Sequence, residues 1–149
     1  MKSIFDQSTR EELIARINKL NESSTPQWGK MTIFQMLKHC TRWDEWVLGT
    51  YNPRYKQDFM GFIFGKIALK SNVKDDRPIQ KNMPAGKLAV KETNGDVTLQ
   101  KQLWIQRIGQ YENYSNPNFI HDFFGKMTKE QIGIFAYKHA DHHLRQFNV

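Results

Sequence analysis

The stretch FFGKMTKEQIGIFAYKHADHHLRQF, residues 123–147, decides the fold of this chain. Thr128 and Gln131 form the S/T-x-x-E/Q pattern of a helix capping box, in which each side chain bonds the backbone N–H of the other residue. An apolar stripe at helical spacing follows this box: Ile132, Phe135, Ala136 and Phe147. The stretch therefore predicts a helix over residues 128–147 with one buried face.

The same reasoning places the other helices in the proline-free parts of the chain. We predict helices over 8–22, 32–49 and 96–114, and a shorter one over 59–70. The Thr9–Glu12 and Thr32–Gln35 pairs are the capping boxes expected for the first two. The expected buried stripes are Leu13, Ile17 and Leu20; Ile33, Met36, Cys40, Trp43 and Val47; and Val97, Trp104, Ile108 and Tyr111. No strand is expected.

The start of the last helix is echoed earlier in the chain. WGKMTIFQ at 28–35 recurs as FGKMTKEQ at 124–131. In both copies glycine permits an unusual turn, threonine caps a helix and glutamine completes the box. The echo predicts two helices that begin in the same way, by a shared good helix start or by an ancient duplication.

Size and composition favour one folded domain, here residues 1–149, which is all-α. A chain of 149 residues is of ordinary domain size, and 39% apolar residues exclude a disordered chain. The single cysteine, Cys40, excludes an internal disulfide and favours a reducing compartment. The apolar run 59–69 is shorter than the ~18–20 residues of a membrane span, and the N-terminus has no signal-peptide core. A cytoplasmic protein is expected.

The net charge of +7 is concentrated in residues 52–95. This segment has nine Lys/Arg and four Asp/Glu residues, which leaves little net charge elsewhere. Such a segment could bind an anion, a nucleic acid or an anionic membrane face, although this spacing is more typical of a solvated surface. We therefore do not expect nucleic acid to be the main partner.

Three of the five histidines lie close together in the last helix. His139 and His143 are four residues apart, so both imidazoles project from one side, near the centre of the apolar stripe. Two imidazoles in an apolar core need partners for their nitrogens, and one divalent metal ion satisfies both. Hydrogen-bonded core histidines, or a partly hydrated helix end, remain the alternatives.

His39 is the natural third ligand. It lies ~10 Å into the helix predicted from Thr32, and His139 and His143 lie ~6–12 Å from the other end of theirs. These levels match if the two helices are antiparallel. Short loops make the helices over 8–22 and 32–49 antiparallel, and likewise those over 96–114 and 128–147. The helices over 32–49 and 96–114 must therefore be parallel. The long 52–95 crossover permits this, which predicts an up-down-down-up four-helix bundle.

We expect lesser roles for the other histidines and for the side chains next to His39. We expect His142 to support or gate the site and His121 to be structural. Cys40 is either a soft ligand or plain core. Trp43, one turn after His39, either lines the pocket or belongs to the core.

Residues near both ends of the chain resemble a known family. WGKMTIFQMLKHC at 28–40, with the C-terminal pattern HxxxHxxQ, resembles the DinB/YfiT-like superfamily of metalloenzymes, and more closely its DUF1569 branch of small bacterial proteins. The resemblance implies a four-helix bundle with His39, His139 and His143 as ligands of Zn²⁺ or Ni²⁺, and Gln146 as the trailing glutamine. It also implies chemistry with low-molecular-weight thiols such as bacillithiol or mycothiol, although the sequence has no arginine-rich thiol-binding motif.

Three functions follow. The first is a metal-dependent enzyme that activates a thiol or water, a transferase or a hydrolase acting on a small molecule. The second is a non-catalytic metal-binding or sensing bundle that forms a homodimer. The third is a basic nucleic-acid or anionic-surface binder that uses residues 52–95. The sequence does not identify the catalytic residues, and imidazoles alone do not identify the metal.

Overall fold

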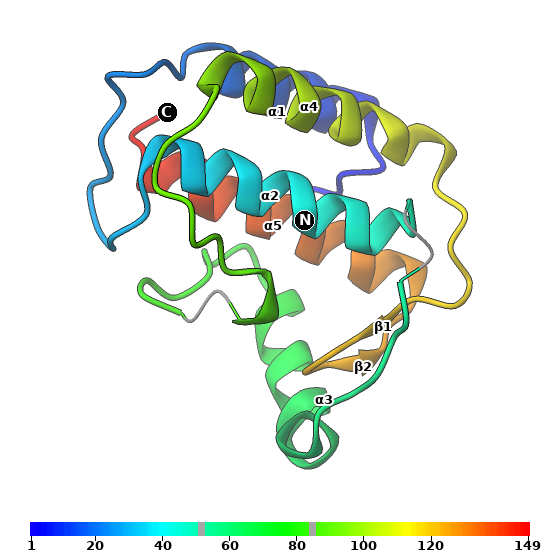
Figure 1. Ribbon diagram of the computed structural model, residues 1–149. Helices are drawn as coiled ribbons and strands as arrows, with labels where there is room; N and C mark the ends of the chain where they lie inside the picture. The colour runs from blue at the N-terminus through cyan, green and yellow to red at the C-terminus, as the bar shows by residue number, and fades with distance from the viewer. Residues whose placement is uncertain (51–52, 84–85) are drawn as a thin grey trace.

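The computed structural model describes residues 1–50, 53–83 and 86–149 and is predominantly helical, an all-α architecture (Figure 1). Its helices are α1 (Gln7–Asn18), α2 (Ile33–Leu48), α3 (Phe59–Val73), α4 (Val97–Gln110) and α5 (Lys129–Gln146). Single 3-10 turns cover Gly86–Leu88 and Tyr111–Asn113. No helix in the described residues is long and apolar enough to cross a membrane.

Four helices surround the core. α2 contacts α4 and α5, and α1 contacts the same two helices from the other side. The colours of Figure 1 show that α2 and α5 lie side by side and run in opposite directions. All side chains of the four predicted apolar stripes are buried, among them Leu13, Met36, Trp104 and Ala136.

The two echoed helix starts have the same structure. Thr32 and Thr128 both cap their helices through complete capping boxes with Gln35 and Gln131, as predicted. The glycines that precede them, Gly29 and Gly125, have positive φ angles of 78° and 74°. The repeated motif therefore encodes the same turn and cap twice.

The predicted capping box of the first helix was wrong, although the predicted start lies within one residue of the observed one. α1 begins at Gln7 after Asp6, and Thr9 is buried in its first turn and does not cap it. The N-terminal segment fixes this start, because the Ile4 N–H donates to the Gly133 carbonyl of α5. Tertiary contact has overridden the local capping pattern.

The expectation of no strand was also wrong. Ile120–His121 (β1) and Gly125–Lys126 (β2) pair as a short antiparallel hairpin. His121 stabilises its turn, since its Nδ1 accepts the backbone N–H of Phe124. Strands of two residues are too short to show the alternation from which strands are predicted.

α3 packs against this hairpin through two glycines. A Cβ atom at Gly61 or Gly65 would lie 2.3 or 2.1 Å from the carbonyl oxygen of Phe123. The backbones of helix and hairpin therefore approach as closely as glycine allows.

Alanine substitutions at two helix glycines, one in this contact and one outside it, are expected to change the free energy of unfolding in opposite directions. Gly65→Ala is expected to lower the free energy of unfolding by about 1–3 kcal/mol, because the methyl group meets backbone atoms. Gly109→Ala, within α4 and with nothing within 4 Å of its Cβ position, is expected to raise it by about 0.5–1 kcal/mol. Urea denaturation of both variants measures the difference, and equal shifts of the same sign would contradict the close packing of α3.

Candidate metal centre

The described part of the chain brings His39, His139 and His143 together between α2 and α5. Their ligand nitrogens all lie within 4.8 Å of one another. The Nε2 atoms of His39 and His139 are 3.2 Å apart, and the three ring centroids are separated by 4.8–5.3 Å. These are the three histidines selected from the sequence.

The helix geometry explains the convergence. His139 and His143 are one turn apart on the same face of α5, and His39 lies near the middle of α2. Because α2 and α5 are antiparallel neighbours, residue 39 of one comes level with residues 139–143 of the other. The helix depths counted from the sequence predicted this match.

The three imidazoles are held in the neutral form. Burial lowers the pKa of His39, and it lowers the pKa of His139 well below the ordinary histidine value. Burial, with the nearby His39, lowers the pKa of His143 to about 3. Neutral imidazole is the form that binds a metal ion, because its unprotonated nitrogen keeps a lone pair.

Outer hydrogen bonds orient two of the rings. His39 Nδ1 lies 3.2 Å from the Leu88 carbonyl oxygen, and His143 Nδ1 lies 3.0 Å from Gln146 Oε1. Since both acceptors require a proton on Nδ1, the Nε2 atoms of His39 and His143 carry the lone pairs. Metal-binding histidines in proteins are usually oriented in this way.

A loop contact fixes Gln146 in turn. Its Nε2 donates to the Trp28 carbonyl at 2.9 Å, which leaves Oε1 directed at His143. Gly29 permits this approach, because a Cβ atom there would lie 2.8 Å from Gln146 Nε2. The first copy of the echoed motif therefore supports the histidine cluster from outside.

One separation within the donor set matches that around a small divalent ion. Two nitrogens bound to one tetrahedral ion at ~2.0–2.1 Å each lie about 3.3–3.4 Å apart. The 3.2 Å between His39 Nε2 and His139 Nε2 is close to this separation. Three imidazoles suit Zn²⁺ or Ni²⁺, and they leave further coordination positions free.

The Trp43 ring covers one side of the cluster. The Trp43 ring stacks on His139 with centroids 4.4 Å apart and an interplanar angle of 22°. Trp43 is buried, so the same side chain is part of the core and lines the site. His142 stays outside the cluster, where its ring meets the edge of Trp28 at 5.8 Å.

His121 and Cys40 lie outside the cluster. His121 is part of the β1–β2 hairpin and packs on Phe124. The Cys40 thiol points to the Met36 sulfur at 3.7 Å, and burial raises its pKa well above the ordinary thiol value. A buried, protonated thiol is a poor ligand, so Cys40 is a core residue.

Sequence reasoning missed the backbone groups of the site. The Leu88 carbonyl, at the last residue of the 3-10 turn, reaches His39. Two residues later the chain still follows α2, because Gln35 Nε2 donates to the Val90 carbonyl. A carbonyl group is present at every residue, so no residue type marks it. The Leu88/Val90 alternation was the only available signal, and it was too short to interpret.

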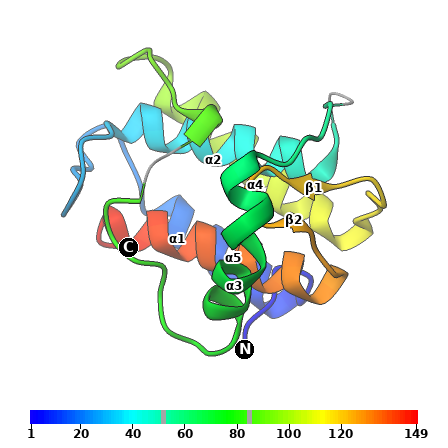
Figure 2. The ribbon, with the colours of Figure 1, turned by 90° about the horizontal axis from the view of Figure 1, so that it is seen from below.

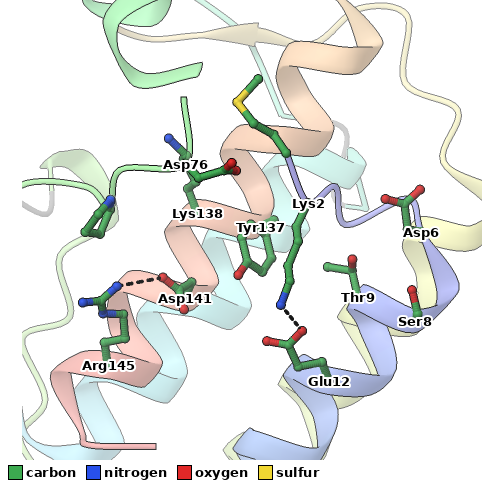
Figure 3. A pocket seen from close by; sticks show the side chains of 12 residues that line it. Lys2, Asp6, Ser8, Thr9, Glu12, Asp76, Tyr137, Lys138, Asp141 and Arg145 are labelled. Atoms are coloured by element: carbon green, nitrogen blue, oxygen red, sulfur yellow. Dashed lines mark hydrogen bonds and ion pairs between the residues drawn. The ribbon is translucent and has the colours of Figure 1, made fainter. Parts of the chain in front are cut away.

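A cavity among the described residues lies away from the histidine cluster. It has a volume of about 620 Å³ and lies between α1 and the face of α5 that carries Tyr137, Asp141 and Arg145 (Figure 3). The Lys2–Glu12 and Asp141–Arg145 ion pairs line it. At ~100° per residue these α5 positions are opposite His139 and His143, so this groove is separate from the histidine cluster. A smaller pocket of about 230 Å³ adjoins Gln35, one turn before His39.

These observations define an all-α protein with a cluster of three histidines, two buried and one half-buried, that could hold a metal ion. The family of proteins of unknown function DUF1569 matches residues 4–149, and the chain belongs to this family. No curated protein and no solved structure gives a significant match.

The outer hydrogen bond of Gln146 allows a specific test of this site. Gln146→Leu is expected to lower the affinity for Zn²⁺ or Ni²⁺ by about 10–100-fold, because His143 loses the acceptor that orients it. Gln102→Leu, on the exposed surface of α4, is the matched control and should bind as the unmodified protein does. Isothermal titration of the metal-free proteins measures both, and identical affinities would contradict a role for Gln146.

Proposed function

We propose that this chain is a metal-dependent enzyme of the DinB-like superfamily. Residues 1–149 are then a single domain in which α1, α2, α4 and α5 form an up-down-down-up four-helix bundle. The mutual contacts of these helices support this arrangement, as does the long segment between α2 and α4 that permits them to run parallel.

The observation that carries the proposal is the histidine cluster. His39, His139 and His143 would hold the ion, and the orienting contacts to Leu88 and Gln146 are those expected of a metal site. Burying three imidazoles in contact with one another is costly unless a shared ligand satisfies them.

The chemistry follows from the donor set. His39, His139 and His143 would hold the ion, which would supply a lowered pKa for a bound thiol or water. The chain excludes bulk solvent there with the buried side chains of Trp43 and Phe135. Binding a thiol gives a transferase for a small electrophilic substrate, and binding water gives a hydrolase.

A second candidate function is non-catalytic metal binding or sensing. The low exposure of two of the three ligands favours it, because His39 and His143 are 3% and 6% exposed while His139 is half-buried. The cavity of about 620 Å³ also lies on the other face of α5. Turnover distinguishes this candidate from the enzyme.

The experiment begins with protein purified without a histidine tag. Metal analysis is expected to find about one Zn²⁺ or Ni²⁺ per chain. The loaded protein is then screened with cysteine, glutathione or bacillithiol and a chromogenic electrophile such as chlorodinitrobenzene. Turnover that depends on the metal and the thiol supports the transferase, whereas saturation with metal without turnover or thiol binding favours the sensor.

A further inference from the structure

The outer surface of α3 is unusually apolar. Six large apolar side chains on this one helix are exposed: Phe59, Met60, Phe62, Ile63, Phe64 and Ile67. Phe59 and Phe62 are each 77% exposed, and Ile67 is 73% exposed. A helix that is apolar all round is normally buried or in contact with lipid.

The packing of α3 explains why this face remains uncovered. The buried side of the helix is narrow and consists of Gly61, Gly65 and Leu69. The two glycines bring the helix against the hairpin backbone and have no side chains of their own to bury. Seen from below, α3 lies in front of α5 and no other element crosses it (Figure 2). Its outward side chains therefore face away from the rest of the fold.

Lysines border this face along the helix, and the nearest acidic residues in sequence, Asp58, Asp75 and Asp76, lie at its two ends. Lys56, Lys66, Lys70 and Lys74 are exposed, and no acidic residue occurs between Phe59 and Lys74. At ~100° per residue, Phe59, Ile63 and Ile67 lie within about 80° of one another, with Lys70 among them and Lys66 at their edge. Long lysine side chains can extend their charged ends past such an apolar surface.

The helix is too short to cross a bilayer and suited to lie on one. Its 15 residues span about 22 Å, less than the ~30 Å hydrocarbon thickness. Exposed Phe, Met and Ile side chains flanked by lysines are typical of helices that insert into the boundary of an anionic membrane.

Other occupants fit less well. A second copy docked on α3 would bring the same lysines together with no acidic residue of α3 to pair with them. A nucleic acid would satisfy the lysines but not the aliphatic side chains of Met60, Ile63 and Ile67.

We infer that α3 is a membrane-docking helix, which binds the surface of anionic lipid bilayers through its outward apolar face and lysine rim. This activity is independent of metal binding, because none of the three histidines belongs to α3.

Flotation of the full chain with vesicles tests the inference. Vesicles of phosphatidylcholine with 30% phosphatidylglycerol should bind the protein, pure phosphatidylcholine should bind at least about tenfold more weakly, and added salt should weaken binding. Combined Phe59→Gln, Ile63→Gln and Ile67→Gln should weaken binding at least about a hundredfold. Combined Lys70→Gln and Lys74→Gln should weaken it about tenfold or more.

Matched controls come from other surfaces. Leu99→Gln replaces an exposed leucine of α4 and Lys19→Gln an exposed lysine at the end of α1, so both should bind as the unmodified protein does. Circular dichroism verifies folding, and the single change Ile63→Gln replaces the triple variant if that variant unfolds.

Three results would overturn the inference. One is the absence of binding to anionic vesicles. Another is a dimer in sedimentation equilibrium that Ile63→Gln dissociates, since α3 would then be a self-association surface. The third is a protein that does not bind the vesicles but binds duplex DNA, and that loses DNA binding in the lysine variant.

Discussion

His39→Ala is expected to abolish stoichiometric binding of Zn²⁺ or Ni²⁺. The substitution removes the only α2 nitrogen in the cluster and leaves His139 and His143, one turn apart, as a two-ligand site. The affinity should fall well beyond the ~10–100-fold loss that accompanies removal of an outer hydrogen-bond partner. Any metal-dependent turnover should be lost with it.

His142→Ala is the matched control. This histidine neighbours His143 but lies outside the cluster, so the variant should keep its metal. Metal analysis after dialysis and thermal unfolding with and without Zn²⁺ provide two readouts, since an ion at a thousand times its Kd adds ~4 kcal/mol to the stability of a binding protein. If His39→Ala and His142→Ala retain metal equally, or the unmodified protein binds none, the cluster is not a metal centre.

The parts of the fold that sequence predicted are those determined by local rules. The boxes at Thr32 and Thr128 and the periodic apolar residues that follow fixed α2 and α5 to within about a residue. The histidine cluster could be predicted because it needs only helix geometry and the relative direction of two helices. The metal ion and the reaction remain predictions, because imidazole ligands are common to several metals and many reactions.

The parts that sequence did not predict depend on contacts between distant segments. α1 starts where its N-terminal segment meets α5, and His39 is oriented by a carbonyl from residue 88. α1 also ends at Asn18, before the predicted residue 22, because Lys19 and Leu20 donate to the carbonyls of Arg16 and Ile17. Gly133 and Leu88 lie outside the window that a periodicity argument uses, whereas the end of α1 is a local change to i→i−3 hydrogen bonds that the apolar pattern does not mark.

α2 also carries a buried acid that the sequence reasoning did not single out. Asp44 is 3% exposed and faces α4, where its two oxygens accept hydrogen bonds from Trp104 Nε1 at 2.9 Å and Tyr111 Oη at 2.8 Å. Burial raises the pKa of Asp44 to about 7, and the two hydrogen bonds only partly oppose this rise. The most extensive helix contact of the fold therefore contains a group that titrates near neutral pH.

The direction in which pH changes the stability follows from the protons that Asp44 binds in the folded and unfolded states. In the unfolded chain Asp44 releases its proton near pH 3.8, whereas the folded protein keeps it until about pH 7. Between these values the folded state binds more protons, so the Asp44 contribution to stability is full below about pH 4 and is lost as the pH rises through 7. A shift of about three pKa units corresponds to about 4 kcal/mol.

Asp44→Asn should remove this pH dependence. Asparagine can accept the Trp104 N–H and donate to the Tyr111 hydroxyl, as a protonated aspartate does. The stability of the variant relative to the unmodified protein should therefore increase by up to about 4 kcal/mol between pH 4 and pH 8. Urea denaturation of both metal-free proteins across this range gives the difference.

The comparison isolates Asp44 because the buried histidines are present in both proteins. Their lowered pKa values give the opposite slope, with stability lost as the pH falls below about 6.5, and this contribution cancels in the difference. A difference that stays constant from pH 4 to pH 8 would show that Asp44 is ionised in the folded protein throughout. The contact between α2 and α4 would then have to stabilise a buried carboxylate by its two hydrogen bonds and the nearby Arg107.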